Sequence, residues 1–394
     1  MPTTPGWEER WLPSPENPDF DSRRVRALRR EPYRAAVPPP IAAADFQVSP
    51  RSLSDADDAS RAIARFDAEH ASFPAPFASV LLRSESASSS EIEHLTAGAR
   101  AVAEAEIDER VQGNAPLIVR NVRAMEAAVA LADDLSNATI IAMHAELLRD
   151  QTPHLVGEFR DQQVWIGGAL PHLAAFVPPH HELVPAAMDD LIAFTERTDL
   201  PLLVLAAIAH AQFETIHPFP DGNGRIGRAL VQAVLRRGGL LRHLTIPVSS
   251  GILTDVDGYF AALDAFRDGD VDPIVDVFSS ASLAGLQNAS TLAGDIRTLQ
   301  AQWDERLSGL RSDATARRIA RLSIEHPVLN ARLAIERTGA SAPAVANGFA
   351  QLVERGVLRP ANSKQRNRVW VNDEVVEALD SFAERSGRRK VPPV

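Results

Sequence analysis

Apolar residues recur at spacings of three and four through most of the middle of the chain, a pattern typical of amphipathic and buried helices. Strand-like runs are rare. The clearest is Gln162–Gly168, a short β-favouring run that two glycines end. We therefore predict a mainly α fold with one small β-hairpin in its core. The helices are predicted over residues 54–70, 91–107, 116–135, 137–150, 182–197, 201–216 and 225–237.

The two ends of the chain have other patterns. Residues 1–75 are rich in proline and charge, and we interpret them as an N-terminal arm packed on a core at 76–290. A linker helix is predicted over 291–312. Residues 313–394 predict two short helices around a turn and then a basic β-hairpin, with its turn near Asn362–Ser363. This order is the outline of a winged helix-turn-helix domain.

Composition narrows the class of protein. The 394 residues are 45% hydrophobic and 24% charged, with a net charge of -11, which argues against broad binding to nucleic acid or anionic membranes but leaves room for a local basic patch. The absence of cysteine excludes disulfides, thiolate catalysis and cysteine zinc sites, and suits a cytoplasmic location. We expect neither a signal peptide nor a membrane span, since no apolar run is long enough.

The stretch HPFPDGNGRIGR, from His217 to Arg228, concentrates polar chemistry. Pro218 disfavours helical backbone at the preceding residue, so a helix ends there and leaves His217 at its end. The loop then brings Gly222 and Gly224 to the start of the next helix. Free N–H groups and a partial positive charge make such a helix start an anion site, and glycine lets an anion approach the backbone closely. The stretch therefore predicts a phosphate site.

The other polar side chains of this stretch suit the same ligand. Arg225 and Arg228 are three residues apart, so they can face one anion, and guanidinium groups bind phosphate oxygens bidentately. Asn223 adds side-chain donors. Asp221 beside a phosphate is most simply a ligand of Mg²⁺. His217 titrates near neutral pH and can accept a proton from an attacking hydroxyl.

This stretch resembles the signature of Fic-family proteins, H-x-F-x-[D/E]-G-N-G-R-x-x-R, and matches each of its fixed positions. The resemblance extends over roughly residues 76–290. It implies a Fic-type helical core and Mg²⁺-dependent transfer of AMP from ATP to a Ser, Thr or Tyr hydroxyl of a target protein, which can include the enzyme itself. By this resemblance His217 is the general base and Asp221 holds Mg²⁺. The phosphates would be held by Gly222, Asn223, Gly224, Arg225 and, at the γ-phosphate, Arg228.

A second segment resembles another part of the family. Gly157–Gly168 is similar to the flap, which positions a target segment beside the phosphates by strand addition. By this resemblance the docking residues are Gln163, Val164, Trp165, Ile166 and Gly167. Further along, the segment DGYFAAL resembles a family segment that often has two tyrosines, and Phe260 replaces the second of them.

The segment SSSEIEH, residues 88–94, has two interpretations. Ser90 and Glu93 have the spacing of a capping box, which would start a helix. The segment also resembles the inhibitory pattern [S/T]-x-x-x-E-[G/N] of many Fic proteins, with Ser89 and Glu93 in place and a departure at the last position. By that resemblance Glu93 pairs with Arg228 and competes with the γ-phosphate, so the enzyme rests largely inhibited.

Other functions stay open. The same site can remove AMP from a modified protein or perform another nucleotidyl or phosphoryl transfer. A DNA-binding regulator with a Fic core is predicted if the basic wing at Ser363–Arg368 contacts phosphates. A di-iron enzyme would use Glu91–His94 and Glu214–His217, but leaves DGNGRIGR unexplained. His210 is interpreted as a packing residue rather than a ligand, and a homodimer is also open.

Overall fold

The structure is a computed structural model that describes residues 5–12, 23–71, 76–110, 112–149, 157–361 and 368–387. It is mostly helical, which confirms the predicted fold class. The chain divides into two compact units, and each is built from three separate stretches of sequence. Unit 1 comprises residues 1–58, 127–238 and 257–279, and unit 2 comprises 59–126, 239–256 and 280–394. The division predicted at residues 75, 290 and 312 stays a prediction.

The first residues of unit 1 form a small sheet that the sequence pattern did not predict. Strand β1 (Gly6–Arg10) pairs antiparallel with β2 (Tyr33–Val37), and helix α1 (Arg23–Leu28) lies between them in the chain. Tyr33 is buried in an apolar cluster with Val177, so the sheet packs on a segment near the predicted flap. The sequence GWEER of β1 lacks alternating apolar positions, which is why its strand was not recognised.

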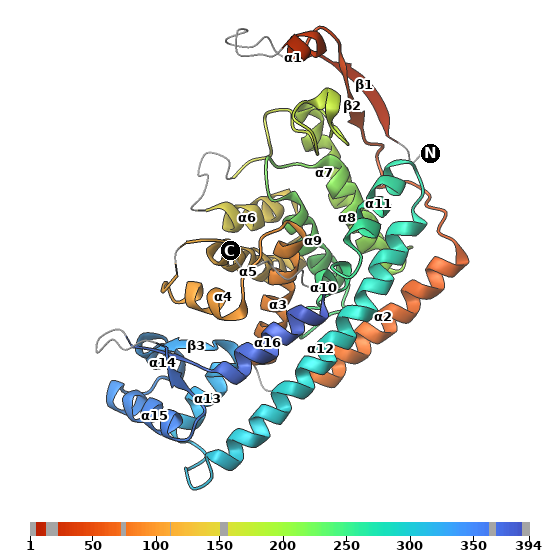
Figure 1. The fold of residues 1–394 in the computed structure, drawn as a ribbon. Helices are drawn as coiled ribbons and strands as arrows, with labels where there is room; N and C mark the ends of the chain where they lie inside the picture. The colour runs from red at the N-terminus through yellow and green to blue at the C-terminus, as the bar shows by residue number, and fades with distance from the viewer. Residues whose placement is uncertain are drawn as a thin grey trace. The chain divides into compact units, whose positions relative to one another are not determined.

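The core of unit 1 is built around α8 (Leu202–Ile216). Every residue of α8 from Leu203 onward is buried, as expected of a helix that is apolar on all sides. It packs between α7 (Val184–Thr195) and α9 (Asn223–Arg237), and α6 (Asn137–Leu148) contacts both of these (Figure 1). The four predicted helices in this region are confirmed to within two residues at each end.

Two long helices start earlier than the sequence pattern predicted. Helix α2 (Pro50–His70) begins before residue 54, because Ser49 Oγ accepts a hydrogen bond from Ser52 N at 3.2 Å and caps a first turn that starts with proline. Helix α12 (Asp272–Arg306) begins before the predicted linker helix at 291–312. Its first residues, Asp272 and a following proline, are a common helix start.

In unit 2, α3 (Pro76–Ile92) packs against α10 (Val248–Ile252), α13 (Thr315–Glu325) and α16 (Asp373–Arg385). Helices α4 (Ala99–Glu106) and α5 (Ala115–Ala130) follow α3 in the chain. In unit 1, 3₁₀ turns and α11 complete the fold: η2 (Ala132–Asp134), η4 (Pro171–Leu173), η5 (His181–Leu183) and α11 (Val256–Arg267), whose first residue belongs to unit 2.

The prediction of one helix over 91–107 is wrong. Helix α3 ends at Ile92 and α4 begins only at Ala99. His94 has a φ of 61°, a left-handed conformation that cannot continue a right-handed helix. The capping-box interpretation is wrong as well, because Ser90 lies in the last turn of α3 and its Oγ donates to Ser86 O at 2.9 Å.

The C-terminal part of unit 2 follows the predicted element order. After α13 come strand β3 (Val328–Asn330) and the two predicted helices, α14 (Ala331–Thr338) and α15 (Ala342–Glu354). Strands β4 (Arg359–Pro360) and β5 (Val369–Val371) pair antiparallel, and the three strands lie in the order β3-β5-β4. Most of the predicted wing, residues 362–367, lies outside the described residues. In the part of the chain that the structure describes, no helix has the length and apolar character to cross a bilayer.

Candidate functional site

The motif histidine lies at the junction between α8 and the loop. His217 has φ 52° and ψ 61°, so it leaves the helix in the left-handed region, while its N–H still donates to Phe213 O at 2.8 Å. For a non-glycine residue before proline this backbone costs on the order of 1–3 kcal/mol, and it persists only where its surroundings enforce it. The predicted helix end at this residue is confirmed.

A buried carboxylate accompanies the imidazole. Glu214 Oε2 lies 3.7 Å from His217 Nδ1, and the two side chains are 9% and 19% exposed. Glu214 is one turn earlier in α8, so the same helix presents both groups. A carboxylate beside one ring nitrogen favours a proton there and leaves the other nitrogen for proton exchange with a ligand. In the sequence analysis Glu214 was named only as an iron ligand of the di-iron alternative.

The loop itself is closed by Asn223. Its Oδ1 accepts from Phe219 N at 2.9 Å and its Nδ2 donates to Phe219 O at 2.7 Å. These two bonds use the amide oxygen and one of the two N–H groups of Nδ2. The expectation that Asn223 offers a side-chain donor to a phosphate stays a prediction. The Asn223 side chain holds the loop shape, and the start of α9 that follows has the character of a helix N-terminal anion site.

His144 of α6 supports the loop from the other side, and the sequence pattern did not single it out. Its ring is fully buried and stacks on Phe219 with centroids 3.8 Å apart, and its Nε2 lies 3.1 Å from Asp221 O. Burial lowers the pKa of His144 to about 4, so at neutral pH the ring is uncharged and Nε2–H donates to the carbonyl. A lone histidine on an apolar helix gave no signal of this role.

Glycine is required at the start of α9. Gly222 has φ 83° and ψ 7°, and a Cβ there would lie 2.6 Å from Leu147 Cδ2. Its N–H donates to Asp221 Oδ1 at 2.7 Å, and its carbonyl accepts from Ile226 N at 3.0 Å. The left-handed backbone therefore disfavours a side chain at residue 222, and the Leu147 side chain would have to shift to admit one.

Two buried guanidinium groups follow in α9. Arg225 and Arg228 are 6% and 2% exposed, and Arg225 Nη2 lies 3.5 Å from Asp221 Oδ2. Together with the helix start they give this end of α9 a positive potential that suits a polyanion. The Asp221 side chain, 63% exposed, is the negative group at its rim.

The Asp221 carboxylate is suited to holding Mg²⁺. Mg²⁺ is usually bound by one or two carboxylates together with substrate phosphates and waters. Asp221 is exposed and adjoins the predicted phosphate site, so it fits this requirement. In the described ranges, no three His, Asp or Glu side chains form a metal-binding cluster, so the di-iron alternative finds no ligand set there.

The flap residues form less regular structure than predicted. Ile166 makes a single antiparallel bridge with Phe176, and the left-handed Gly167 and Gly168 begin the turn between them. Gln163 Nε2 donates to Val164 O and to Pro178 O, both at 2.9 Å. The predicted hairpin is shorter because prolines in the returning segment lack the N–H that a ladder needs.

Packing between α8 and α9 depends on a second glycine and on His210. A Cβ at Gly227 would lie 3.0 Å from Glu214 Oε1 and 3.1 Å from His210 Nδ1. His210 is fully buried and its Nε2 lies 2.8 Å from Tyr259 Oη. Burial lowers the pKa of His210 to about 3, so this histidine is neutral. The interpretation of His210 as a packing residue is confirmed. Phe260, which follows Tyr259 in the chain, is 48% exposed.

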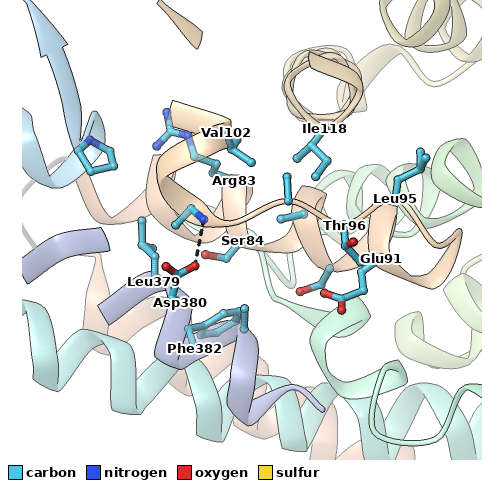
Figure 2. Close-up of a pocket in the computed structure, with 16 residues that line it drawn as sticks. Arg83, Ser84, Glu91, Leu95, Thr96, Val102, Ile118, Leu379, Asp380 and Phe382 are labelled. Atoms are coloured by element: carbon cyan, nitrogen blue, oxygen red, sulfur yellow. Dashed lines mark hydrogen bonds between the residues drawn. The ribbon is translucent and has the colours of Figure 1, made fainter. Parts of the chain in front are cut away.

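The predicted inhibitory residues lie at the end of α3. Ser89 is fully buried in the helix, and Glu93 is exposed just beyond it. His94 adopts the left-handed conformation that glycine and asparagine favour, although it departs from the pattern in residue type. A cavity of about 60 Å³ adjoins this part of α3 (Figure 2). Asp380 of α16 lines it and accepts a hydrogen bond from Ala99 N at 3.0 Å.

Two family models match the chain. The Fic/DOC family model matches residues 134–235, which include α6, α7, α8, most of α9 and the loop between α8 and α9. Residues 134–235 are therefore similar to a Fic/DOC domain. The Fic/DOC family N-terminal model matches residues 53–130, which include α3 and the predicted inhibitory segment. The crystal structure of a Fic family protein from Desulfovibrio desulfuricans shares the fold, with a TM-score of 0.54 and 22% identity over 83% of this chain and 97% of that chain.

Curated relatives of the Fic domain are named protein adenylyltransferases. Protein adenylyltransferase fic-1 of Caenorhabditis elegans is 30% identical over 158 residues, which are 39% of this chain and 28% of that protein. Protein adenylyltransferase Fic of Drosophila melanogaster is 30% identical over 142 residues, 36% of this chain and 27% of that protein. A probable protein adenylyltransferase of Aquifex aeolicus is 43% identical over 70 residues, 17% of this chain and 22% of that protein. The chain spans less than a third of the length of these relatives.

Proposed function

We propose that this protein transfers AMP from ATP to a Ser, Thr or Tyr hydroxyl of a protein. The observation that carries the proposal is the complete Fic signature, which joins His217 and a neighbouring carboxylate to a glycine-started helix with two buried arginines. Relatives named protein adenylyltransferase support the same reaction.

In this reaction His217 removes the proton of the target hydroxyl. The hydroxyl oxygen forms a bond to the α-phosphorus of ATP, the bond from that phosphorus to the bridging oxygen breaks, and pyrophosphate leaves with the electron pair. His217 then releases its proton to solvent. Little covalent chemistry is asked of the protein, so most of the acceleration comes from positioning and from stabilising charge on the phosphates.

The loop would bind the nucleotide. Backbone N–H groups at Asn223 and Gly224 would donate to phosphate oxygens, and Gly222 would join them by exchanging its bond to Asp221 Oδ1 for one to phosphate. Arg225 and Arg228 would balance the phosphate charge, with Arg228 at the γ-phosphate. Asp221 would hold Mg²⁺, which when bound neutralises phosphate charge. The residues Gln163–Gly167 would dock the target segment beside this site.

Glu93 would regulate the same site. A carboxylate and a γ-phosphate compete for one guanidinium, so a Glu93 side chain on Arg228 would prevent productive nucleotide placement. The buried Ser89 and the left-handed His94 support this proposal, since they fix the end of the helix from which Glu93 follows.

The alternative functions, removal of AMP and DNA binding, have less support from the structure. Removal of AMP would use the same residues, and the test below separates the directions. DNA binding through a winged helix stays a prediction that the order of elements supports. However, the exposed positions of α15 contribute no cation to a phosphate backbone. They are Ala342, Pro343, Ala346, Asn347, Ala350 and Glu354.

Intact-mass spectrometry after incubation with ATP and Mg²⁺ tests the proposal. We expect the protein or an added target to gain one AMP group, and more of it when Glu93 is changed to glycine. His217→Ala should lower the rate by about 10²- to 10⁴-fold, the usual contribution of a general base. His243→Ala, a change at an exposed histidine outside the site, is the control and should leave the rate unchanged.

The other outcomes discriminate among the alternatives. A gain of one phosphate group instead of AMP would indicate phosphoryl transfer. Loss of AMP from a previously modified protein, with no gain in the forward direction, would indicate the reverse reaction. An absence of any adduct and of pyrophosphate release, in wild type and in Glu93→Gly alike, would contradict the proposal.

A further inference from the structure

Arg160, at the start of the flap, is a buried cation whose hydrogen-bond acceptors are all backbone carbonyls. It is 4% exposed, and no carboxylate pairs with it among the residues described. Burial lowers its pKa to about 10, so the guanidinium stays charged at neutral pH. Its side chain donates to His217 O at 2.8 Å, Gln162 O at 2.8 Å, Pro179 O at 2.5 Å and Ile216 O at 3.4 Å.

Two of these acceptors lie at the end of α8. The last carbonyls of a helix have no partner within it, and a cation there is favoured by the helix dipole. Arg160 binds the carbonyls of Ile216 and His217, and its own N–H donates to Pro218 O at 2.9 Å. One residue thus holds three consecutive carbonyls around the left-handed histidine. These contacts stabilise the strained backbone of His217, which would otherwise be unfavourable.

The other two acceptors belong to the flap. Gln162 precedes the predicted docking residues, and Pro179 follows the segment that returns from them. The neighbouring Gln163 also bonds Pro178 O, so both ends of the flap are joined where Arg160 reaches them. The guanidinium therefore connects the base of the flap with the peptide units on both sides of His217.

Burying a charge without a carboxylate is unfavourable unless its donors are satisfied. An uncharged side chain could fill the same volume, yet it could not donate to four carbonyls as the guanidinium does. The fork geometry of the guanidinium therefore explains the choice of residue.

We infer that Arg160 is the positioning residue that couples the flap to the base: it holds His217 in register with a hydroxyl docked on the flap. This inference rests on the proposed function. In this inference Arg160 sets the position of the His217 imidazole relative to the docked hydroxyl. Nucleotide binding depends instead on the loop that Asn223 and His144 hold.

Arg160→Lys tests the inference, because lysine keeps the charge but cannot make the planar set of bonds. We expect kcat to fall about 10²-fold, the cost of a misplacement near 1 Å, with KM for ATP unchanged. The matched control is Arg197→Lys in the same unit, whose guanidinium also donates to a backbone carbonyl, Ala44 O at 2.6 Å, and should leave kcat unchanged.

A second readout is independent of activity. In spectra of protein with ¹⁵N-labelled histidine, the His217 ring should give one sharp set of resonances in wild type and shifted or broadened ones in Arg160→Lys, with His144 unaffected. If wild type transfers no AMP, the proposed function fails while these spectra still test the positioning role. Arg160→Gln replaces the lysine variant if that variant does not fold, because a neutral amide removes the buried charge.

Three results would overturn the inference. The first is kcat within about threefold of wild type together with unchanged His217 resonances, since a misplaced base must cost far more than this. The second is a raised KM for ATP with kcat unchanged, which would place Arg160 in nucleotide binding. The third is loss of fold in both variants, which would make the residue structural.

Discussion

At the scale of single residues, the site depends on two backbone positions in the left-handed region. His217 ends α8 and Gly222 starts α9, and a short loop separates the two positions. His217 is held by the carbonyl contacts of Arg160, whereas Gly222 needs no support because it has no Cβ. The two positions therefore respond differently to mutation.

Gly222→Ala should destabilise the protein by about 2 kcal/mol or more, because left-handed backbone costs an alanine roughly 1–2 kcal/mol and the new Cβ meets Leu147. Urea unfolding measures this change. Gly239→Ala is the matched control, since Gly239 has φ 77° and a Cβ there would have nothing within 4 Å. Equal losses in the two variants would show that contact with Leu147 contributes nothing.

At the scale of elements, the end of α3 supports Glu93, the residue that we propose to be inhibitory. Asn121 of α5 donates to Ser86 O at 2.8 Å and to Ser90 Oγ at 3.1 Å, so the last turn of α3 is held by a neighbouring helix. Arg83, near the middle of α3, pairs with Glu106 and donates to Glu325 O. Glu93 projects from a fixed support rather than from a fraying end.

Glu93→Gly should raise AMP incorporation roughly tenfold, within the range typical of coupling between sites. The rate is measured with ATP labelled in the α-phosphate. Glu109→Gly removes another exposed glutamate, in the turn after α4, and should change nothing. An unchanged rate in Glu93→Gly would refute the inhibitory role while leaving the proposed transfer intact.

At the scale of the whole molecule, the two compact units interleave along the chain. Boundaries between them fall within α2, α5, α11 and α12, so each of these helices contributes residues to both units. Local patterns of apolar residues identify helices but carry no information about which helices gather together, because that depends on contacts between distant segments. This is why the composition shifts along the chain did not reveal the units.

The stability of the whole protein should fall as pH falls from 6.5 to about 4. An unfolded histidine gains a proton below pH 6.5, whereas burial lowers the pKa of folded His144 to about 4, so the unfolded state binds more protons in this window. His144 alone should contribute about 3 kcal/mol to this loss. Urea unfolding at pH 7.0, 5.5 and 4.0 gives the slope.

His144→Phe keeps a ring against Phe219 but cannot titrate, so its unfolding free energy should depend less on pH than that of wild type. His243→Phe, at an exposed position, should retain the wild-type slope. The same slope in His144→Phe and wild type would mean that His144 does not cause the acid sensitivity.

By itself the sequence determined the shape of the loop between α8 and α9, from the helix end at His217 to the glycine at the start of α9. These features follow from the backbone restrictions of proline and glycine, which act over a few residues. Only the tertiary structure showed that Arg160 and His144 support this loop. They lie 57 and 77 residues from the carbonyls of His217 and Asp221 that they bind, and such contacts depend on how α6, the flap and α8 pack together.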